Sequence, residues 1–198
     1  MATRKRDIKD GPEELKNELN SAEKILLLLL SADRGKSIPG NLWLQKETFL
    51  IAESLQPLKE YFNFEAHLQG PFSETVNNMA EDLQYLGLLE RDRKGLRLTE
   101  KGKDVAESVQ KGTDEEIIEM VQDSKTKLND LSKDELLVYI YYTHPEMTTE
   151  SLEKEDLEPK RASVAEKLHQ RGKVDLEKGA ELAGMSVSSF QEQLSKST

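Results

Sequence analysis

The sequence predicts a mainly α-helical protein with one short β-hairpin. Apolar residues recur at helical spacing along most of the chain, and typical helix-capping residues precede several of these stretches. Charged residues make up 33% of the chain and aromatic residues 6%, which suits a helix-rich protein with a modest core. A chain of 198 residues is long enough for one compact domain and a smaller second one.

Composition excludes several classes of function. The absence of cysteine excludes disulfides, thiolate chemistry and zinc sites that need cysteine. The longest apolar run, Ile25 to Leu30, is far shorter than the ~20 residues of a membrane span, and no signal peptide is visible. We therefore expect a cytoplasmic protein without a membrane partner.

The net charge of −10 makes the chain a poor generic ligand for nucleic acid, because phosphate neutralisation supplies most non-specific affinity. Any contact with DNA must come from a local basic patch. Residues 1–19 are expected to form a flexible tail, whose Arg4-Lys5-Arg6 cluster is either solvated or a phosphate-binding arm.

The first firm element is a helix predicted over residues 21–32. Asn20 and Glu23 have the spacing of a capping pair. The run from Ile25 to Leu30 is apolar on every side, so this helix should lie at the centre of the core.

Two further helices and a strand are predicted before the hairpin. A helix covers residues 42–55, and alternating polarity over residues 61–68 predicts a short strand. Ser73 is expected to cap a third helix over residues 74–86, which Gly87 ends.

The most specific pattern is a charged hairpin. Residues 88–91 and 96–98 read as strands joined by a turn at 92–95, and Thr99 caps the helix that follows. Alternation turns the leucines of the return strand inward and Arg97 outward. A helix followed by such a hairpin and a capped helix is typical of a winged helix-turn-helix domain, in which the hairpin is the wing.

Several short motifs in this region match a known family. They are Leu44-Gln45-Lys46 with Phe49-Leu50, Phe64-Glu65, Gly70-Pro71-Phe72-Ser73, Leu83, Leu86-Gly87-Leu88 and Leu98-Thr99-Glu100-Lys101-Gly102. Over about residues 24–105 the chain thus resembles the YwgA-like proteins, an uncharacterised prokaryotic winged-helix family. The resemblance implies the fold and a regulatory role, without a known activity. We assign residues 20–105 to this domain.

A helical extension is predicted over residues 106–145. Thr113 with Glu116 reads as a capping box for a helix that runs to about residue 128. Ser132 with Glu135 opens a second, strongly apolar helix. That helix is expected to pack on the core or to form a homodimer interface.

The C-terminal part is predicted to be an acidic linker, residues 146–160, followed by a small helix-turn-helix module, residues 161–198. Asp175 is expected to cap the first helix of the motif, Gly184 to form its tight turn and Ser186 to cap its second helix. Ala180 is expected to let the two helices approach closely, and Met185 and Phe190 are expected to fill the core between them.

This module also matches a small family. Gly172-Lys173-Val174, the run from Glu181 to Ser186, and Phe190 carry the match, whereas Gly179 and Asp175 stand where the family has alanine and serine. The segment resembles antitoxin-like regulators, although the N-terminal segment of that family is absent here.

Two surfaces are candidates for contact with DNA. The first is the wing, whose cations would lie along the phosphate backbone or simply solvate the hairpin tip; they are Arg91, Arg93, Lys94 and Arg97. The helix over 74–86 is a weaker candidate for base reading, because it carries acids and no Lys or Arg.

The second surface is the last helix, which offers neutral donors and acceptors suited to base edges. They are Ser188, Ser189, Gln191 and Gln193. Lys173 and Lys178 would approach phosphates. The alternative is that this module docks on a protein partner or on a second copy of the chain.

Catalytic interpretations find little support. The three histidines are isolated, and neither a phosphate-binding glycine loop nor a nucleophile elbow is present. We therefore predict a non-enzymatic protein without cofactor or metal: a homodimeric, DNA-associated transcriptional regulator. The alternative is a protein–protein adaptor or antitoxin-like factor that docks on a larger partner through the acidic face of the winged-helix domain.

Overall fold

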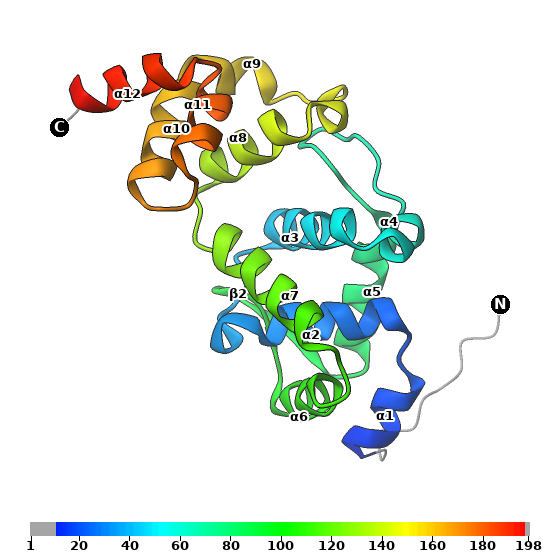
Figure 1. Ribbon diagram of the computed structural model, residues 1–198. Coiled ribbons are helices and arrows are strands. Elements are labelled where there is room, and N and C mark those ends of the chain that lie inside the picture. The colour runs from blue at the N-terminus through cyan, green and yellow to red at the C-terminus, as the bar shows by residue number, and fades with distance from the viewer. Residues whose placement is uncertain (1–10, 197–198) are drawn as a thin grey trace. The chain divides into compact units, whose positions relative to one another are not determined.

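The computed structural model describes residues 11–196 of the chain. This part is mainly helical and contains one two-stranded antiparallel sheet, which confirms the predicted fold class at this level (Figure 1). It forms two compact units: unit 1 comprises Met1–Asn63 with Ser73–Asn129, and unit 2 comprises Phe64–Phe72 with Asp130–Thr198. The division after Asn129 falls inside the predicted helical extension. Within residues 11–196, no helix combines the length and apolar character needed to cross a bilayer.

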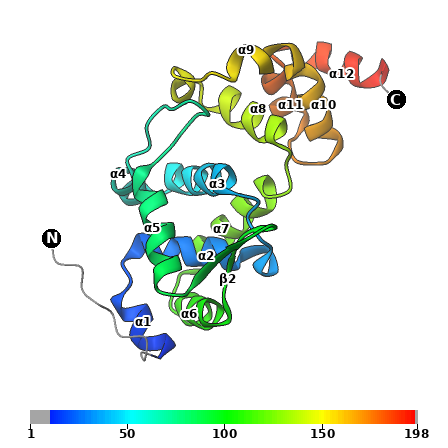
Figure 2. The same cartoon turned by 180° about the vertical axis from the view of Figure 1, so that it is seen from behind.

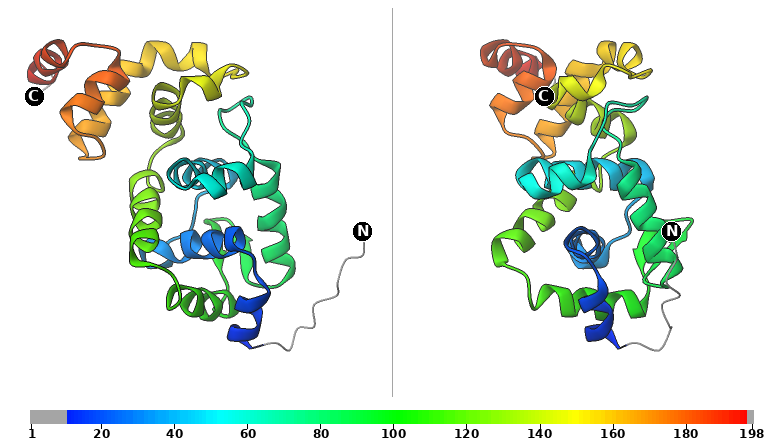
Figure 3. Two further views of the ribbon diagram at one scale, coloured as in Figure 1. Left: turned by 45° about the vertical axis from the view of Figure 1, so that its right-hand side comes forward. Right: turned by 90° about the vertical axis from the view of Figure 1, so that its right-hand side faces the viewer.

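Unit 1 is built around helix α2. Its elements are α1 (Pro12–Glu18), α2 (Ser21–Gly35), α3 (Asn41–Ser54), α4 (Gln56–Phe62), α5 (Glu74–Tyr85), β1 (Leu89–Asp92), β2 (Gly95–Leu98), α6 (Glu100–Gln110) and α7 (Glu115–Leu128). The right-hand view of Figure 3 looks along α2 and shows α3, α5, α6 and α7 around it. Leu26, Leu27, Leu29 and Leu30 are at most 1% exposed, as their continuous apolar run predicted.

Helix α7 holds the end of α2 in place. The backbone of α2 leaves helical conformation at Ala32, and Asp33 and Arg34 adopt the left-handed conformation, with φ of 48° and 57°. A helix leaves its last carbonyls without intrahelical donors, and Lys125 Nζ donates to the carbonyl of Leu30 at 3.0 Å. The amide of Asp33 donates to Gln122 Oε1 at 2.9 Å. Two side chains of α7 thus satisfy the backbone where α2 breaks.

Two buried groups of opposite charge, Lys125 of α7 and Glu47 of α3, influence each other electrostatically without a direct hydrogen bond. Lys125 and Glu47 are both 0% exposed. Burial raises the pKa of Glu47 well above its ordinary value, and the positive charges of Lys125 and Lys36 oppose this rise. Burial also lowers the pKa of Lys125 to about 8, against the opposing effect of Glu47. Ser124 Oγ donates to the backbone carbonyl of Glu47 at 3.0 Å, which adds a neutral link between the same two helices.

Unit 2 packs around helix α8. Its elements are α8 (Lys133–Thr143), the 3-10 turns η1 (Pro145–Thr148) and η2 (Glu158–Lys160), α9 (Lys154–Leu157), α10 (Arg161–Gln170), α11 (Leu176–Ala183) and α12 (Val187–Lys196). Leu136, Leu137, Val138 and Ile140 are 0% exposed. The apolar residues of α8 are therefore core residues, and they leave no apolar stripe for the expected dimer contact.

Five predicted N-caps are confirmed. Each side chain accepts a hydrogen bond from the first turn of its helix; the capping residues are Asn20, Ser73, Thr99, Ser132 and Asp175. The capping box predicted at Thr113 is wrong. Helix α7 instead starts after Asp114, and the Thr113 hydroxyl donates back to the carbonyl of Val109 at 2.8 Å.

The strand predicted over residues 61–68 is also wrong. Helix α4 runs through Phe62, and the only pairing that follows is formed by isolated bridges at Glu65 and Leu68. Pro57 lies in the first turn of this helix, which proline fits because the N–H that it lacks would have no intrahelical acceptor there. Leu58 and Phe62 then bury one face at i,i+4 spacing.

Two segments expected to be irregular contain helix. Residues 12–18 of the predicted tail form α1, which packs on α6 and buries Leu15. Residues 146–160 of the predicted linker contain most of η1, all of α9 and η2, and bury Leu157. One buried leucine in each segment is enough to anchor a short amphipathic turn.

We predict that Lys125→Met lowers the free energy of unfolding of unit 1 by about 3–5 kcal/mol, because it leaves the Glu47 carboxyl buried without its cation. Urea unfolding followed by the fluorescence of Trp43, the only tryptophan, reports on α3 directly.

The matched control is the double variant Glu47→Leu/Lys125→Met, which removes both buried charges. It should recover most of the loss, with a remainder for the hydrogen bond to Leu30. Equal instability of the single and double variants would show that the uncompensated charge of Glu47 is not the cause.

Candidate nucleic-acid interface

The hairpin β1–β2 is anchored by leucines and by an isolated β-bridge to Ile38. Leu89 pairs with Leu98 and Arg91 with Leu96, and the three leucines are at most 5% exposed. Ile38 lies on the other edge of β2, where its amide and carbonyl bond the carbonyl and amide of Leu96 at 2.9 and 2.8 Å. Figure 2 shows the hairpin beside the end of α2.

Gly95 makes the close approach of Ile38 to β2 possible. Its φ is +121°, and a Cβ at this position would lie 2.0 Å from the carbonyl oxygen of Ile38. Any side chain at this position would push the backbone of Ile38 away from the hairpin. The turn predicted at residues 92–95 therefore has to end in glycine.

The four predicted cations of the hairpin fall into two groups. Arg97 is held by Glu90 at 2.9 Å and by Asp92 at 3.3 Å on the same hairpin. Arg91, Arg93 and Lys94 are exposed, and their side chains form no ion pair within residues 11–196. These three side chains are available to an external anion.

A hollow of about 680 Å³ lies between the hairpin, the turn that ends α2 and the start of α6. Its cations are Arg34, Lys36, Lys94, Arg97 and Lys103, and its acids are Asp33, Glu90 and Glu100. Lys103 is paired with Glu100 at 2.6 Å and Lys36 lies 4.0 Å from Asp33. Arg34 and Lys94 have no ion pair in the described structure, so the hollow carries positive charge that its own acids do not neutralise.

Helix α5 presents a different surface. Ser73 caps it, and Val76, Met79 and Leu83 bury one face. The opposite face exposes Glu74, Asn78, Glu81, Asp82, Gln84 and Tyr85. This helix has no basic residue, so its exposed face would meet phosphates with like charge.

In unit 2, α11 and α12 form a helix-turn-helix around Gly184. Gly184 has φ of +70° and ends α11, and Ser186 Oγ accepts from the amide of Ser189 at 3.2 Å at the start of α12. Phe190 is 0% exposed. The close helix approach is at Gly179 rather than at Ala180, because a Cβ on Gly179 would lie 2.6 Å from the Phe190 ring.

Arg161 of α10 braces the tight turn. Its guanidinium donates to the carbonyls of Leu182 and Glu181 at 2.5 and 3.0 Å, at the end of α11. It lies 3.7 Å from the centre of the Tyr142 ring in a cation–π contact. Burial and the hydrogen bond to Glu158 raise the pKa of Tyr142 to about 12, so this hydroxyl remains a donor.

The predicted phosphate contacts of unit 2 are already engaged. Lys173 binds Asp130 at 2.6 Å and Lys178 binds Glu181 at 2.8 Å. The predicted base-reading residues are better placed: Ser188, Ser189 and Gln191 are exposed, whereas Gln193 is half-buried and contacts Glu166 at 3.4 Å. Unit 2 thus offers neutral hydrogen-bonding groups with little free positive charge.

Sequence reasoning missed Arg34 as a candidate. This residue lies just after the helix predicted over residues 21–32, in a charged run that local spacing gives no reason to connect with the hairpin. The bend at this point brings Arg34 beside the hairpin, 60 residues further along the chain. A long-range contact of this kind leaves no signal in local spacing.

The histidines and the acidic side chains of the described residues form no metal-binding cluster: among residues 11–196, no group of three or more His, Asp or Glu side chains is arranged to hold a metal ion. His169 Nδ1 lies 3.1 Å from the carbonyl of Val174 and its ring packs edge-on against Phe190. His67 packs on Phe72, and His144 lies 3.5 Å from Glu146.

Comparison with known proteins gives no assignment: no family model, no curated protein and no solved structure matches the chain. The resemblances to the YwgA-like and antitoxin-like families therefore stay predictions from the sequence.

We predict that Gly184→Ala destabilises the α11–α12 pair by about 1–2 kcal/mol, because an L-residue must adopt the left-handed conformation there. A Cβ would also meet the Arg161 guanidinium at 2.8 Å. Hydrogen exchange of the α11 amides measures the loss locally.

Gly172→Ala is the matched control, because Gly172 has φ of +66° and no atom within 4 Å of an added Cβ. Faster exchange in α11 for Gly184→Ala than for Gly172→Ala would isolate the contribution of Arg161. Equal exchange in both variants would contradict a bracing role.

Proposed function

We propose that this protein is a non-enzymatic, DNA-associated transcriptional regulator. In this proposal unit 1 is a winged helix-turn-helix domain, with α2, α3 and α5 as its three helices and the hairpin β1–β2 as its wing. The order of elements supports it: helix α2, the bridge residue Ile38, the three helices α3, α4 and α5, and then a hairpin that pairs with Ile38. The insertion between α3 and α5 is larger than a simple turn.

The observation that carries the proposal is the free positive charge of the wing. Arg91, Arg93 and Lys94 have no ion pair in the described chain, and Arg34 adds a fourth free cation at the adjoining hollow. Guanidinium and ammonium groups in such a cluster suit the phosphates of a DNA backbone, which fix position without reading sequence.

Base reading is assigned to α12 rather than to α5. The acids of α5 oppose entry into a groove lined by phosphates, whereas α12 exposes Ser188, Ser189 and Gln191 as neutral partners for base edges. We also propose a homodimer, in which the two copies would present two wings. The arrangement of that dimer would decide whether one or both units of a chain contact the same duplex.

We predict that Arg91→Gln/Arg93→Gln/Lys94→Gln abolishes most of the binding to a random-sequence duplex at low salt. Each phosphate contact contributes about 0.9 to the slope of log K against log salt, so the slope should fall by about 2.7 if all three residues contact phosphates. Fluorescence anisotropy of a labelled duplex over a salt series measures both quantities.

The control variant is Lys59→Gln/Lys111→Gln/Lys160→Gln, which changes the net charge equally. These lysines are exposed and paired with Glu53, Glu107 and Asp134. If both triple variants bind DNA as the native chain does, or if the native chain binds none, the wing is not a DNA contact.

We further predict that Gln191→Ala alters the sequence that the protein selects from a randomised duplex library, because a bidentate base contact contributes about 1–3 kcal/mol of discrimination. Lys178→Ala should leave the selected sequence and the affinity unchanged, because Lys178 is already bound to Glu181. A selected sequence that ignores Gln191 would remove α12 as the reading helix.

A protein–protein adaptor is the second candidate, and one observation favours it. Tyr85 is 77% exposed at the end of the acidic face of α5. An exposed tyrosine beside carboxylates suits a protein surface better than a phosphate backbone. An adaptor would keep its partner when the three wing cations are neutralised, whereas the DNA-binding proposal requires a loss.

A further inference from the structure

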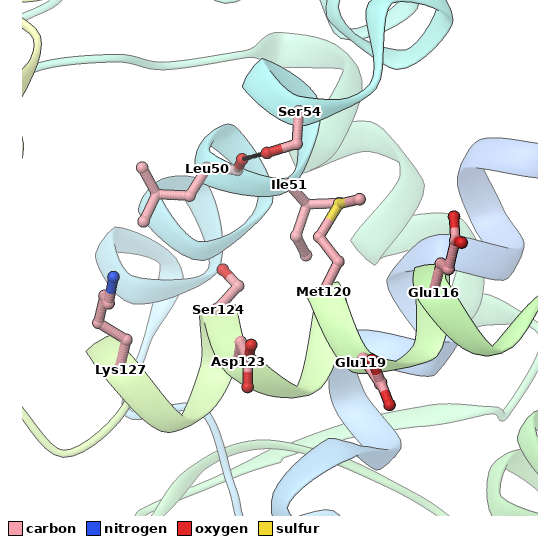
Figure 4. Close-up of a pocket in the computed structure, with 9 residues that line it drawn as sticks. All are labelled: Leu50, Ile51, Ser54, Glu116, Glu119, Met120, Asp123, Ser124 and Lys127. Atoms are coloured by element: carbon pink, nitrogen blue, oxygen red, sulfur yellow. Dashed lines mark hydrogen bonds between the residues drawn. The ribbon is translucent and has the colours of Figure 1, made fainter.

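A groove of about 470 Å³ runs between α3 and α7 of unit 1, on residues that the proposed DNA contacts do not use. Leu50, Ile51 and Ser54 of α3 form one side of it. Figure 4 shows Ile51 beside Met120 of α7, Leu50 pointing toward the end of the groove where Lys127 lies, and the Ser54 hydroxyl turned to the carbonyl of Leu50.

The floor of the groove is apolar. Ile51 is fully buried, and Leu50 and Met120 are partly exposed along the opening. Methionine adapts its shape to different apolar partners, which is why it recurs at surfaces that bind helices. A side chain seated between Leu50 and Met120 would remove apolar surface of both from water.

The α7 edge of the groove carries three acids and, at one end, one cation, Lys127. Glu116, Glu119 and Asp123 are exposed, and their carboxylates form no ion pair or hydrogen bond within residues 11–196. Their spacings of three and four residues place them in one stripe on α7. Like charges at these spacings destabilise a helix slightly, so cations placed along the stripe would relieve this repulsion.

The backbone of the groove walls is closed to hydrogen bonding from outside. Both walls are α-helices, whose amides and carbonyls are paired within each helix. An extended peptide would find no strand edge to pair with. A ligand can therefore contact only the side chains of the two helices. A helix that inserts apolar residues into the groove meets these conditions.

We propose that the groove between α3 and α7 docks an amphipathic helix of a protein partner, with aliphatic residues on Leu50, Ile51 and Met120 and with lysine or arginine facing the α7 acids. Charge complementarity identifies the partner as basic. The same carboxylates repel a phosphate backbone, so the site is separate from the wing and binds protein while the wing binds DNA.

The test uses the full chain labelled with ¹³C at its methionine methyl groups and a synthetic 18-residue helical peptide of leucine and lysine. The chain has five methionines, so the Met120 signal is assigned by its loss in Met120→Leu. Titration should shift the Met120 signal and leave those of Met79, Met147 and Met185 in place. A matched leucine–glutamate peptide should shift none of them.

Glu116→Gln/Glu119→Gln/Asp123→Asn should weaken peptide binding at least tenfold. Glu74→Gln/Glu81→Gln/Asp82→Asn on α5 changes the net charge equally and should weaken it less than twofold. The proposal is overturned if the two triple variants behave alike, because the peptide then senses only net charge. It is also overturned if the Met120 signal does not respond.

One more variant tests whether the chain itself is the occupant. Arg4→Glu/Lys5→Glu/Arg6→Glu reverses the basic cluster of the N-terminal segment in the full chain. The Met120 signal should be unchanged by this reversal in the absence of peptide. A shift would assign the groove to that segment and overturn the assignment to a partner. Duplex binding by the wing is measured separately, so failure here leaves the proposed DNA contact untouched.

Discussion

One face of α7 fixes the geometry on which the rest of unit 1 depends. Gln122, Lys125 and Asn129 are spaced by three and four residues. Each bonds the backbone at the end of α2 or just after it, at Asp33, Leu30 and Ser37. These bonds hold a turn that contains two residues in the left-handed conformation, which costs about 1–2 kcal/mol for each. The turn delivers Ile38 to the edge of β2 and Arg34 to the hollow beside the hairpin. A bundle helix therefore determines where the hairpin and its free cations lie.

This arrangement requires charged and polar groups to be buried. On α3, the four consecutive residues Gln45, Lys46, Glu47 and Thr48 are at most 2% exposed. Gln45 offsets its burial with two hydrogen bonds to the backbone of Ser73, at 3.0 and 2.9 Å, which also position the start of α5. Burial lowers the pKa of Lys46 to about 7. Glu47 has no hydrogen bond to its carboxylate in the described structure and relies on the charge of Lys125. Removing one partner of such a pair is more costly than replacing both by apolar residues.

Local signals were sufficient to predict much of this structure from the sequence. Capping side chains at Asn20, Ser73 and Thr99, and the apolar run of α2, act within one helical turn and so fix their elements without tertiary information. The buried face of α3 was not predictable, because hydropathy alone places Lys46 and Glu47 in water. The strand expected over residues 61–68 failed because alternation over a few residues does not distinguish a strand from a helix end followed by an irregular loop. At the candidate interface, the hairpin pattern was sufficient to predict the exposed cations of β1–β2. The ion pairs of Arg97, Lys173 and Lys178 were not predictable, because local sequence patterns do not encode which acid each cation meets.

The net charge of the chain says less about its possible ligands than the distribution of its charged side chains does. A net charge of −10 would oppose any phosphate ligand if it acted as a single field. At physiological ionic strength, however, exposed charges more than about 8 Å apart are largely screened, so a ligand senses mainly the groups close to it. Near Arg91 and Lys94 these groups include cations that lack an internal partner, whereas near Glu119 they are unpaired acids. Unit 1 therefore carries two surfaces of opposite sign, and the two proposed ligands, a phosphate backbone and a basic helix, would each meet the local charge rather than the net charge of the chain.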